Sequence, residues 1–266
     1  YLSSAPKYNL LYEGFGWEVP TYVHCSPVMR DAQNKMSKRH GDPSYEDLRD
    51  QGYLTPAILN YVALLGWSPK GELAEQEIFS LPELVQAFEL NGVSKSPAIF
   101  DLDKLTHFNA LYLRALSPEA FLQAAEPYIR QTVKNYAPGL IAPLLQARCE
   151  KLTDIPEKVD FFDTLPDYGV DLFTNKKSKC TPEVAKRMLD AAIPALEGLT
   201  DWTQENIHNC LTTLAEQLEV KTATLMWPVR ISAAGKAVTP GGAVEICHIL
   251  GREETVRRLK LGAEKC

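Results

Sequence analysis

Apolar residues recur at helical spacing over most of this chain, and the pattern predicts a mainly helical protein. The clearest case runs from Thr55 to Gly66, where a proline at the second position favours a helix start. Its apolar face consists of Ile58, Tyr61, Val62 and Leu65. Because such a stripe has to be buried, we expect this helix to pack against a neighbour.

Several other helices are predicted to begin at hydroxyl residues that are followed by glutamate. Ser80 and Glu83 have the spacing of a capping box, in which the hydroxyl and the carboxylate each accept a hydrogen bond from a free backbone N–H. Ser117 and Thr181 are each followed by Pro-Glu, and the second pattern opens a helix that we expect to reach about Gly198. Further helices are expected after Thr203, Thr222 and Gly242, with Gly251 dividing the last two.

Two features are expected to break this pattern between residues 117 and 181. Pro127 lacks a backbone donor and clashes with the preceding turn, so we expect it to interrupt the helix that follows Ser117. The next helix is predicted over Gly139–Leu152. The turn-forming residues Asn175–Ser178 then mark a predicted boundary between two helical subdomains.

The first residues show a different pattern. Tyr1–Phe15 predicts a helix that Gly16 ends, and the β-branched and aromatic residues of Thr21–Ser26 predict a strand. A helix followed by a strand is typical of an α/β domain. Because the chain opens on tyrosine inside a predicted helix, we expect it to be part of a longer protein.

Composition narrows the class of protein without identifying a partner. A net charge of −6 does not indicate a nucleic-acid ligand. No apolar run has the roughly 20 residues that a membrane span needs, and the first residues lack the order of a signal peptide. The six cysteines form no Cys-x-x-Cys pair, so we expect reduced, mostly buried thiols and no metal site. These features predict a cytoplasmic protein with no membrane partner.

A short basic loop carries the candidate chemistry. Lys35, Lys38 and Arg39 lie within the run Lys-Met-Ser-Lys-Arg. Lysine supplies a flexible point charge and arginine a planar fork of donors, and both bind phosphate oxygens. A mobile cationic loop can stabilise the charge that develops on a leaving pyrophosphate. Taken alone, this spacing is equally typical of an exposed basic surface.

The same run resembles the Lys-Met-Ser-Lys-Ser signature of class I aminoacyl-tRNA synthetases, in the Lys-x-Ser-Lys-Arg form of the bacterial-type glutamyl enzymes. Collinear matches extend the resemblance over essentially the whole chain. They include Tyr1–Lys7, Gly52–Leu54, Ala57–Tyr61, Leu65–Ser68 and Phe100–Leu105. The resemblance implies the C-terminal portion of such an enzyme.

This resemblance implies a role for each loop residue. Lys38 is expected to be the catalytic lysine that contacts the ATP phosphates, and Lys35, Met36, Ser37 and Arg39 complete the ATP-binding loop. The implied reaction of the full-length enzyme activates glutamate with ATP and magnesium and transfers it to tRNA(Glu). The implied partners are tRNA(Glu), ATP and glutamate, without DNA, and a monomer is expected.

The sequence departs from the family pattern in one respect. Class I enzymes use a His-x-Gly-His element, and this sequence contains none. We therefore expect the chain to bind tRNA, to hold no cofactor tightly, and not to form glutamyl adenylate by itself.

The resemblance also implies an anticodon-binding site. Arg148 matches the position at which glutamyl enzymes that reject tRNA(Gln) use an arginine at the third anticodon base. An arginine fork suits this role because it can bond the edge of an unstacked base. Arg230 resembles a second anticodon-contacting arginine, and Thr239 and Pro240 resemble the turn beside it.

Together, these patterns predict a mainly α fold in four segments. Residues 1–34 are expected to end a class I α/β nucleotide-binding domain, and residues 35–115 to form the signature loop and a helical stem-contact domain. Residues 116–180 and 181–266 are expected to form two helical subdomains of an anticodon-binding domain. The alternatives are a stand-alone helical tRNA- or RNA-binding module and a helical protein-interaction scaffold.

Overall fold

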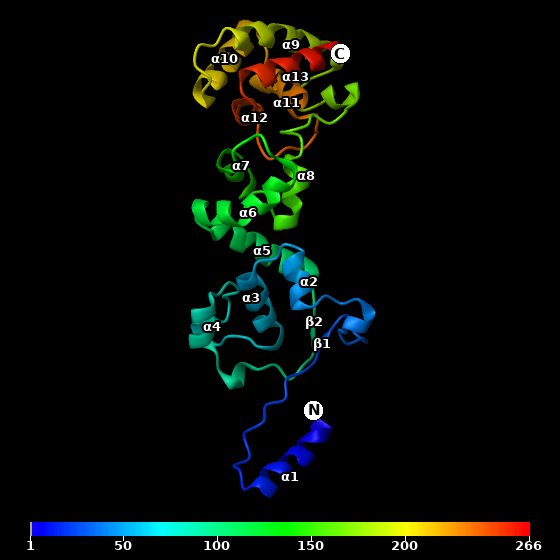
Figure 1. Cartoon of the computed structure of the whole chain (residues 1–266), viewed down its shortest axis with the longest axis vertical. Coiled ribbons are helices and arrows are strands. Elements are labelled where there is room, and N and C mark those ends of the chain that lie inside the picture. Colours follow the sequence, from blue (N-terminus) through cyan, green and yellow to red (C-terminus); the bar gives the residue numbers. More distant parts are fainter. Residues whose placement is uncertain (1) are drawn as a thin grey trace. The chain divides into compact units, whose positions relative to one another are not determined.

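Helices carry almost all of the regular structure of this protein, as the apolar spacing predicts (Figure 1). The computed structural model describes residues 2–266, so the predicted helix start at Tyr1 lies outside the described residues. The chain divides into two units, which we call unit 1 (Tyr1–Asn109) and unit 2 (Ala110–Cys266). The further predicted divisions at residues 34 and 180 stay predictions.

Unit 1 contains short helices and one small sheet. The α-helices are α1 (Ala5–Phe15), α2 (Tyr45–Asp50), α3 (Thr55–Gly66), α4 (Leu81–Ala87) and the first part of α5 (Leu102–Ala115). The strands β1 (Val28–Met29) and β2 (Ala98–Ile99) pair in parallel. Single 3-10 turns lie at Leu2–Ser4, Lys38–His40, Gly71–Leu73 and Leu90–Gly92.

Helix α3 lies at the centre of the unit 1 core, which confirms its predicted packing. Ile58 and Tyr61 are buried in a cluster with residues of α2, α5 and the α2–α3 loop, namely Leu48, Tyr53, Leu105 and Phe108. Val62, predicted on the same face, is 47% exposed. The buried Asn60 side chain adds a polar tie, because it donates to Glu77 O and accepts from Phe79 N.

The prediction of a strand at Thr21–Ser26 is wrong. This segment has no regular structure, and the strand that forms is Val28–Met29. A strand needs a neighbour for its backbone groups, and β2 pairs only with Val28 and Met29. Phe100 N extends this ladder by donating to Met29 O (2.8 Å).

Unit 2 is a helical assembly with an apolar core. It contains the end of α5 and helices α6 (Pro118–Thr132), α7 (Pro138–Leu145), α8 (Ile155–Val159), α9 (Pro182–Glu197), α10 (Gln204–Gln217), α11 (Thr222–Ala234), α12 (Ala243–Leu250) and α13 (Arg252–Lys265). Single 3-10 turns lie at Leu152–Asp154 and Val170–Phe173. Helix α9 packs on α11 and α13, burying Met188, Leu189 and Ala192.

The predicted caps are confirmed. Ser80 and Glu83 form the capping box of α4, and the Ser117 and Thr181 hydroxyls accept from backbone N–H groups at the starts of α6 and α9. Thr203 caps α10 in the same way. These motifs are read from the sequence reliably because each involves residues within one helical turn.

Two predictions for α6 and α7 are wrong. Helix α6 continues through Pro127, because its buried residues Phe121, Ala125 and Ile129 hold both halves in the core despite the lost donor. Helix α7 ends at Leu145 rather than Leu152. The N–H groups of both Arg148 and Cys149 donate to Leu145 O, which closes the helix in a tight turn.

One arginine ties three segments of unit 2 together. Arg258 on α13 is fully buried, and its guanidinium donates to the carbonyls of Phe161, Phe162 and Ala233, each at 2.7 Å. It also pairs with Glu254 at 2.6 Å. Arg258 therefore joins the end of α11 to the turn that follows α8.

Candidate functional site

The basic loop of unit 1 has a defined backbone. Lys35 lies opposite Met29 in an antiparallel bridge, and Arg30 N donates to Asn34 O (2.8 Å). Asp31 holds the turn between them by accepting from the backbone and side-chain N–H groups of Asn34 and from Gln33 N. These hydrogen bonds, that from the Asn34 side chain first, lower the pKa of Asp31 to about 2.

Ser37 and Asp42 shape the second half of this loop. Ser37 N donates to Asp42 Oδ2 (2.7 Å), and Ser37 Oγ accepts from Arg39 N (3.3 Å). A 3-10 turn over Lys38–His40 follows and ends at Gly41, whose φ of 81° favours glycine. The loop is thus shaped by short polar groups, without the use of its cationic side chains.

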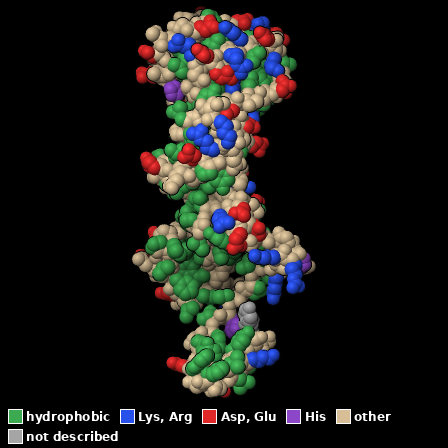
Figure 2. Space-filling model, viewed as in Figure 1, with side chains coloured by type: hydrophobic (Ala, Val, Ile, Leu, Met, Phe, Trp, Pro, Cys, Tyr) green, Lys and Arg blue, Asp and Glu red, His purple; other side chains and the backbone are tan. Residues whose placement is uncertain are grey.

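The loop cations Lys35, Lys38 and Arg39 are exposed. None of the three forms an ion pair with a carboxylate among residues 2–266. Figure 2 shows basic side chains gathered on the part of unit 1 beside β1. Met36 and Ser37 are half-buried, so the loop presents its cations and turns its other residues inward.

In unit 2, three of the predicted anticodon residues meet. Arg148 follows α7 and Arg230 lies on α11, yet both donate to Thr239: Arg148 Nη1 to its carbonyl (3.4 Å) and Arg230 Nη1 to its hydroxyl (2.8 Å). Thr239 Oγ1 in turn donates to Gly241 O (2.7 Å). The fold therefore brings together residues that are 91 positions apart in the sequence.

Arg230 is largely committed to holding the loop between α11 and α12. Its Nη2 donates to Ala237 O (2.9 Å), and its guanidinium carbon lies 4.7 Å from the centre of the Trp227 ring. Burial lowers the pKa of Arg230, although an arginine remains charged at neutral pH. Trp227 is half-buried and donates its indole N–H to Leu172 O (3.1 Å).

The other predicted residues differ in exposure. Arg148 is exposed, and its hydrogen bond to Thr239 is longer than that of Arg230 (3.4 Å against 2.8 Å). Thr239 is half-buried and Pro240 is buried. Of these four side chains, only Arg148 presents its donors openly to solvent.

Lys236 anchors the start of the same loop, a role that the sequence did not suggest. Its Nζ donates to Glu157 O and pairs with Asp160, each at 2.6 Å. The preceding Gly235 has a φ of 64°, and a Cβ there would lie 2.9 Å from the Pro166 ring. Only glycine fits this helix end without displacing a neighbour.

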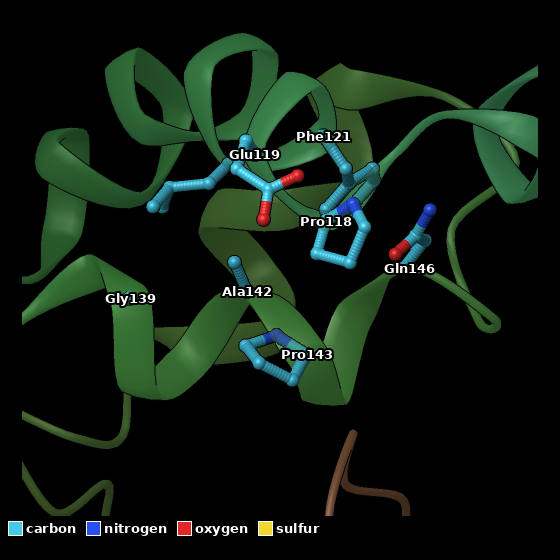
Figure 3. A pocket seen from close by; sticks show the side chains of 8 residues that line it. Pro118, Glu119, Phe121, Gly139, Ala142, Pro143 and Gln146 are labelled. Carbon is cyan, nitrogen blue, oxygen red and sulfur yellow. The ribbon is translucent and has the colours of Figure 1, made fainter.

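A hollow of about 370 Å³ lies between α6 and α7 (Figure 3). Pro118, Phe121, Ala142 and Pro143 line it, with the Glu119 carboxylate beside them. The amide of Gln146 at its edge donates to carbonyls at and just beyond the end of α5, including Leu116 O (2.8 Å). An apolar wall with an exposed carboxylate does not suit a phosphate-bearing ligand.

No group of three or more His, Cys, Asp or Glu side chains is placed to hold a metal ion within residues 2–266. In this part of the chain, no helix is both long and apolar enough to cross a membrane.

Comparisons with known proteins agree with the two-unit division. Residues 1–107 match the family model of the catalytic domain of class I tRNA synthetases (E and Q). Residues 113–263 match the model of an anticodon binding domain. The boundary between the two matches falls close to Asn109, where the units divide.

The similar proteins and solved structures are glutamate–tRNA ligases, also named glutamate–tRNA synthetases. The chain is 48% identical to glutamate–tRNA ligases of Clostridium tetani and Clostridium acetobutylicum, over its full length and 54% of theirs. The crystal structure of a glutamate tRNA ligase from Elizabethkingia meningosepticum in complex with its amino acid matches 99% of this chain, with a TM-score of 0.80 and 30% identity. The Elizabethkingia anophelis enzyme matches with a TM-score of 0.81 and 29% identity.

The chain spans about half the length of these relatives: 54% of the two ligases and 55% of the two structures. Unit 1 matches the catalytic-domain model, and nearly all of unit 2 matches the anticodon-binding-domain model. The chain therefore belongs to the glutamate–tRNA ligase family of class I tRNA synthetases.

Proposed function

We propose that this chain is the tRNA-binding part of a glutamate–tRNA ligase and that unit 2 binds the anticodon loop of tRNA(Glu). The observation that supports this most is the meeting of Arg148 and Arg230 at Thr239. A base edge in an unstacked loop is bound by donors held in place, and this arrangement holds the exposed Arg148 guanidinium beside a loop that Arg230 fixes. The compartment proposed is the cytoplasm.

Arg148 is the proposed reader of the third anticodon base. It is exposed, whereas the donors of Arg230 go to Ala237 and Thr239 within the loop. Arg230, Thr239 and Pro240 therefore act in this proposal mainly by setting the position of the loop that faces the anticodon. Arg148 uses its Nη1 for the long bond to Thr239 O, which leaves the Nε and Nη2 donors of its guanidinium for a base.

Lys38 is the proposed catalytic residue of the full-length enzyme. Its exposed ammonium, with Lys35 and Arg39, suits the phosphate oxygens of ATP, on which negative charge increases as glutamate is activated. Magnesium accompanies ATP in this proposal and is held through the phosphates. The loop backbone, shaped by Asp31 and Asp42, positions the cations without neutralising them.

The first experiment measures binding of the chain to tRNA(Glu), to tRNA(Glu) with a changed third anticodon base and to an unrelated tRNA, at physiological salt. Wild-type protein should prefer tRNA(Glu). Arg148→Ala should lower the preference for the natural third base by roughly tenfold or more. Arg187→Ala, an exposed arginine on α9, serves as the matched control and should keep the preference.

Two outcomes contradict this proposal. An equal loss of affinity for all three tRNAs on Arg148→Ala makes Arg148 a phosphate contact instead of a reader. Equal and weak binding of every tRNA by wild-type protein favours the protein-interaction scaffold. A stand-alone RNA-binding module is distinguished by the next experiment.

The second experiment uses the ligase at the length of its relatives. Lys38→Ala should reduce ATP–pyrophosphate exchange by orders of magnitude, because it removes charge stabilisation at the leaving group, and should leave tRNA affinity nearly unchanged. The present chain alone should show no exchange. Robust exchange by this chain, or full activity of the Lys38→Ala enzyme, refutes the assignment.

A further inference from the structure

Val238 is the most exposed large apolar side chain among the described residues, at 85%. It lies in the loop between α11 and α12, between Ala237 and Thr239. Single exposed apolar side chains are common on protein surfaces and need no explanation by themselves. What distinguishes Val238 is the way in which the residues around it are held.

Both neighbours of Val238 are fixed by charged side chains. Arg230 binds Ala237 O and the Thr239 hydroxyl, so one guanidinium clamps the residues before and after Val238. Lys236 ties the start of the loop to Glu157 and Asp160. The conformational entropy of the loop is therefore lost on folding, and a ligand that meets Val238 does not have to order the loop.

The other apolar surface beside this clamp is already in use. Trp227 has one ring face covered by Arg230 and its indole N–H bonded to Leu172 O. Pro240 is buried. Val238 is thus the large apolar side chain that the clamped loop presents to solvent, beside the small exposed Ala237 and next to the carbonyl that Arg148 contacts.

We propose that Val238 packs against the face of an unstacked nucleobase in the tRNA anticodon loop, beside the base that Arg148 binds. This inference rests on the proposed function. Bases in single-stranded loops are commonly splayed out and held by side chains on their faces. Every base has an apolar face, so this contact contributes affinity and leaves the choice of base to Arg148.

The test compares Val238→Ser with wild-type protein in titrations against tRNA(Glu) and the third-base variant of that tRNA, at several salt concentrations. Val238→Ser should weaken binding of both RNAs by the same factor, roughly three- to tenfold. The slope of affinity against salt should not change, because no phosphate contact is lost. Val238→Phe, with a larger flat surface, should tighten binding of both.

The matched control is Val85→Ser, at another exposed valine (70%) on α4 of unit 1, which should bind as wild type does. Thermal unfolding of Val238→Ser should match wild type, since an exposed side chain contributes little to the core. If wild-type protein binds tRNA(Glu) specifically and Val238→Ser binds it equally well, this inference is overturned and the proposed function stands. A changed base preference, or a reduced salt slope, also overturns it. Absence of specific tRNA binding by wild-type protein overturns the proposed function together with this inference.

Discussion

The cations of the basic loop in unit 1 and the cations that hold the core and the α11–α12 loop of unit 2 have opposite surroundings. In unit 1, Lys35, Lys38 and Arg39 are exposed and form no ion pair within the described residues. In unit 2, Arg258 and Arg230 donate to backbone carbonyls, and Lys236 pairs with Asp160. Lysine and arginine occur in both sets. A cation that finds a carbonyl or carboxylate within the protein holds the fold, and a cation without such an acceptor is left for a ligand.

The apolar side chains differ in the same direction. Helix α1 buries none of its residues, and Leu10, Leu11 and Phe15 are each more than half exposed. In unit 2, by contrast, α11 alone buries Leu225, Val229 and Ile231 completely. Stability in unit 2 thus comes from packing around a buried polar tie, whereas the described residues bury no residue of α1. The experiments below test this contrast, beginning with the largest expected effect.

The strongest test removes the tie at the centre of unit 2. Arg258→Met should lower the free energy of unfolding by about 3–5 kcal/mol, because it leaves the carbonyls of Phe161, Phe162 and Ala233 without their donor and removes one of the two arginines that pair with Glu254. Chemical denaturation followed by circular dichroism measures the change. Arg257→Ala is the control, since Arg257 shares Glu254 but is largely exposed, and it should cost at most about 1 kcal/mol. Similar losses from both variants would mean that burial of Arg258 adds nothing.

Acid should weaken unit 2 through Glu254. Hydrogen bonds from Arg257 and then from Arg258 lower the pKa of Glu254 from 4.5 to about 2. A carboxylate with a lowered pKa in the folded state stabilises the protein fully above its unfolded pKa, and this contribution is lost as the pH falls from about 4.5 toward 2. The loss should be no more than about 3 kcal/mol. Unfolding midpoints measured across this range should fall less in Glu254→Gln, and an equal fall in both proteins would contradict the assignment.

The polar tie of unit 1 should be weaker. The buried Asn60 joins Glu77 O to the buried Phe79 N, and Asn60→Ala should cost about 1–3 kcal/mol because the Phe79 amide loses this acceptor. Asn91→Ala, at an exposed asparagine, should have little effect. Hydrogen exchange of the Phe79 amide reports on this unit directly. Unchanged protection of that amide in Asn60→Ala would show that the tie is dispensable.

The smallest effect on stability is expected in the basic loop. Lys38→Gln should leave the melting temperature unchanged within error, because Lys38 is exposed and the loop is shaped by Asp31, Ser37 and Asp42 instead. Asp42→Asn, which weakens the bond to Ser37 N, serves as the contrasting variant. A clear loss of stability in Lys38→Gln would place the lysine among the residues that hold the fold.

Local sequence patterns predicted helix starts well. The Ser80 capping box and the Ser117 and Thr181 caps form as expected, since each involves neighbours in one turn. The errors concern elements whose fate depends on distant residues. Thr21–Ser26 forms no strand without a pairing neighbour, and α6 passes Pro127 because its buried face is held from outside the helix.

For the site, the sequence by itself determined the chemical types: a cationic loop at Lys35–Arg39 and candidate arginines at 148 and 230. Only the tertiary structure decided how they are used. It joins Arg148 to Thr239 across 91 positions, commits Arg230 to the loop, and leaves Val238 exposed on that loop. The reason is physical: a cap or a signature depends on neighbours in the chain, whereas exposure and partnership of a side chain depend on which distant segments fold against it.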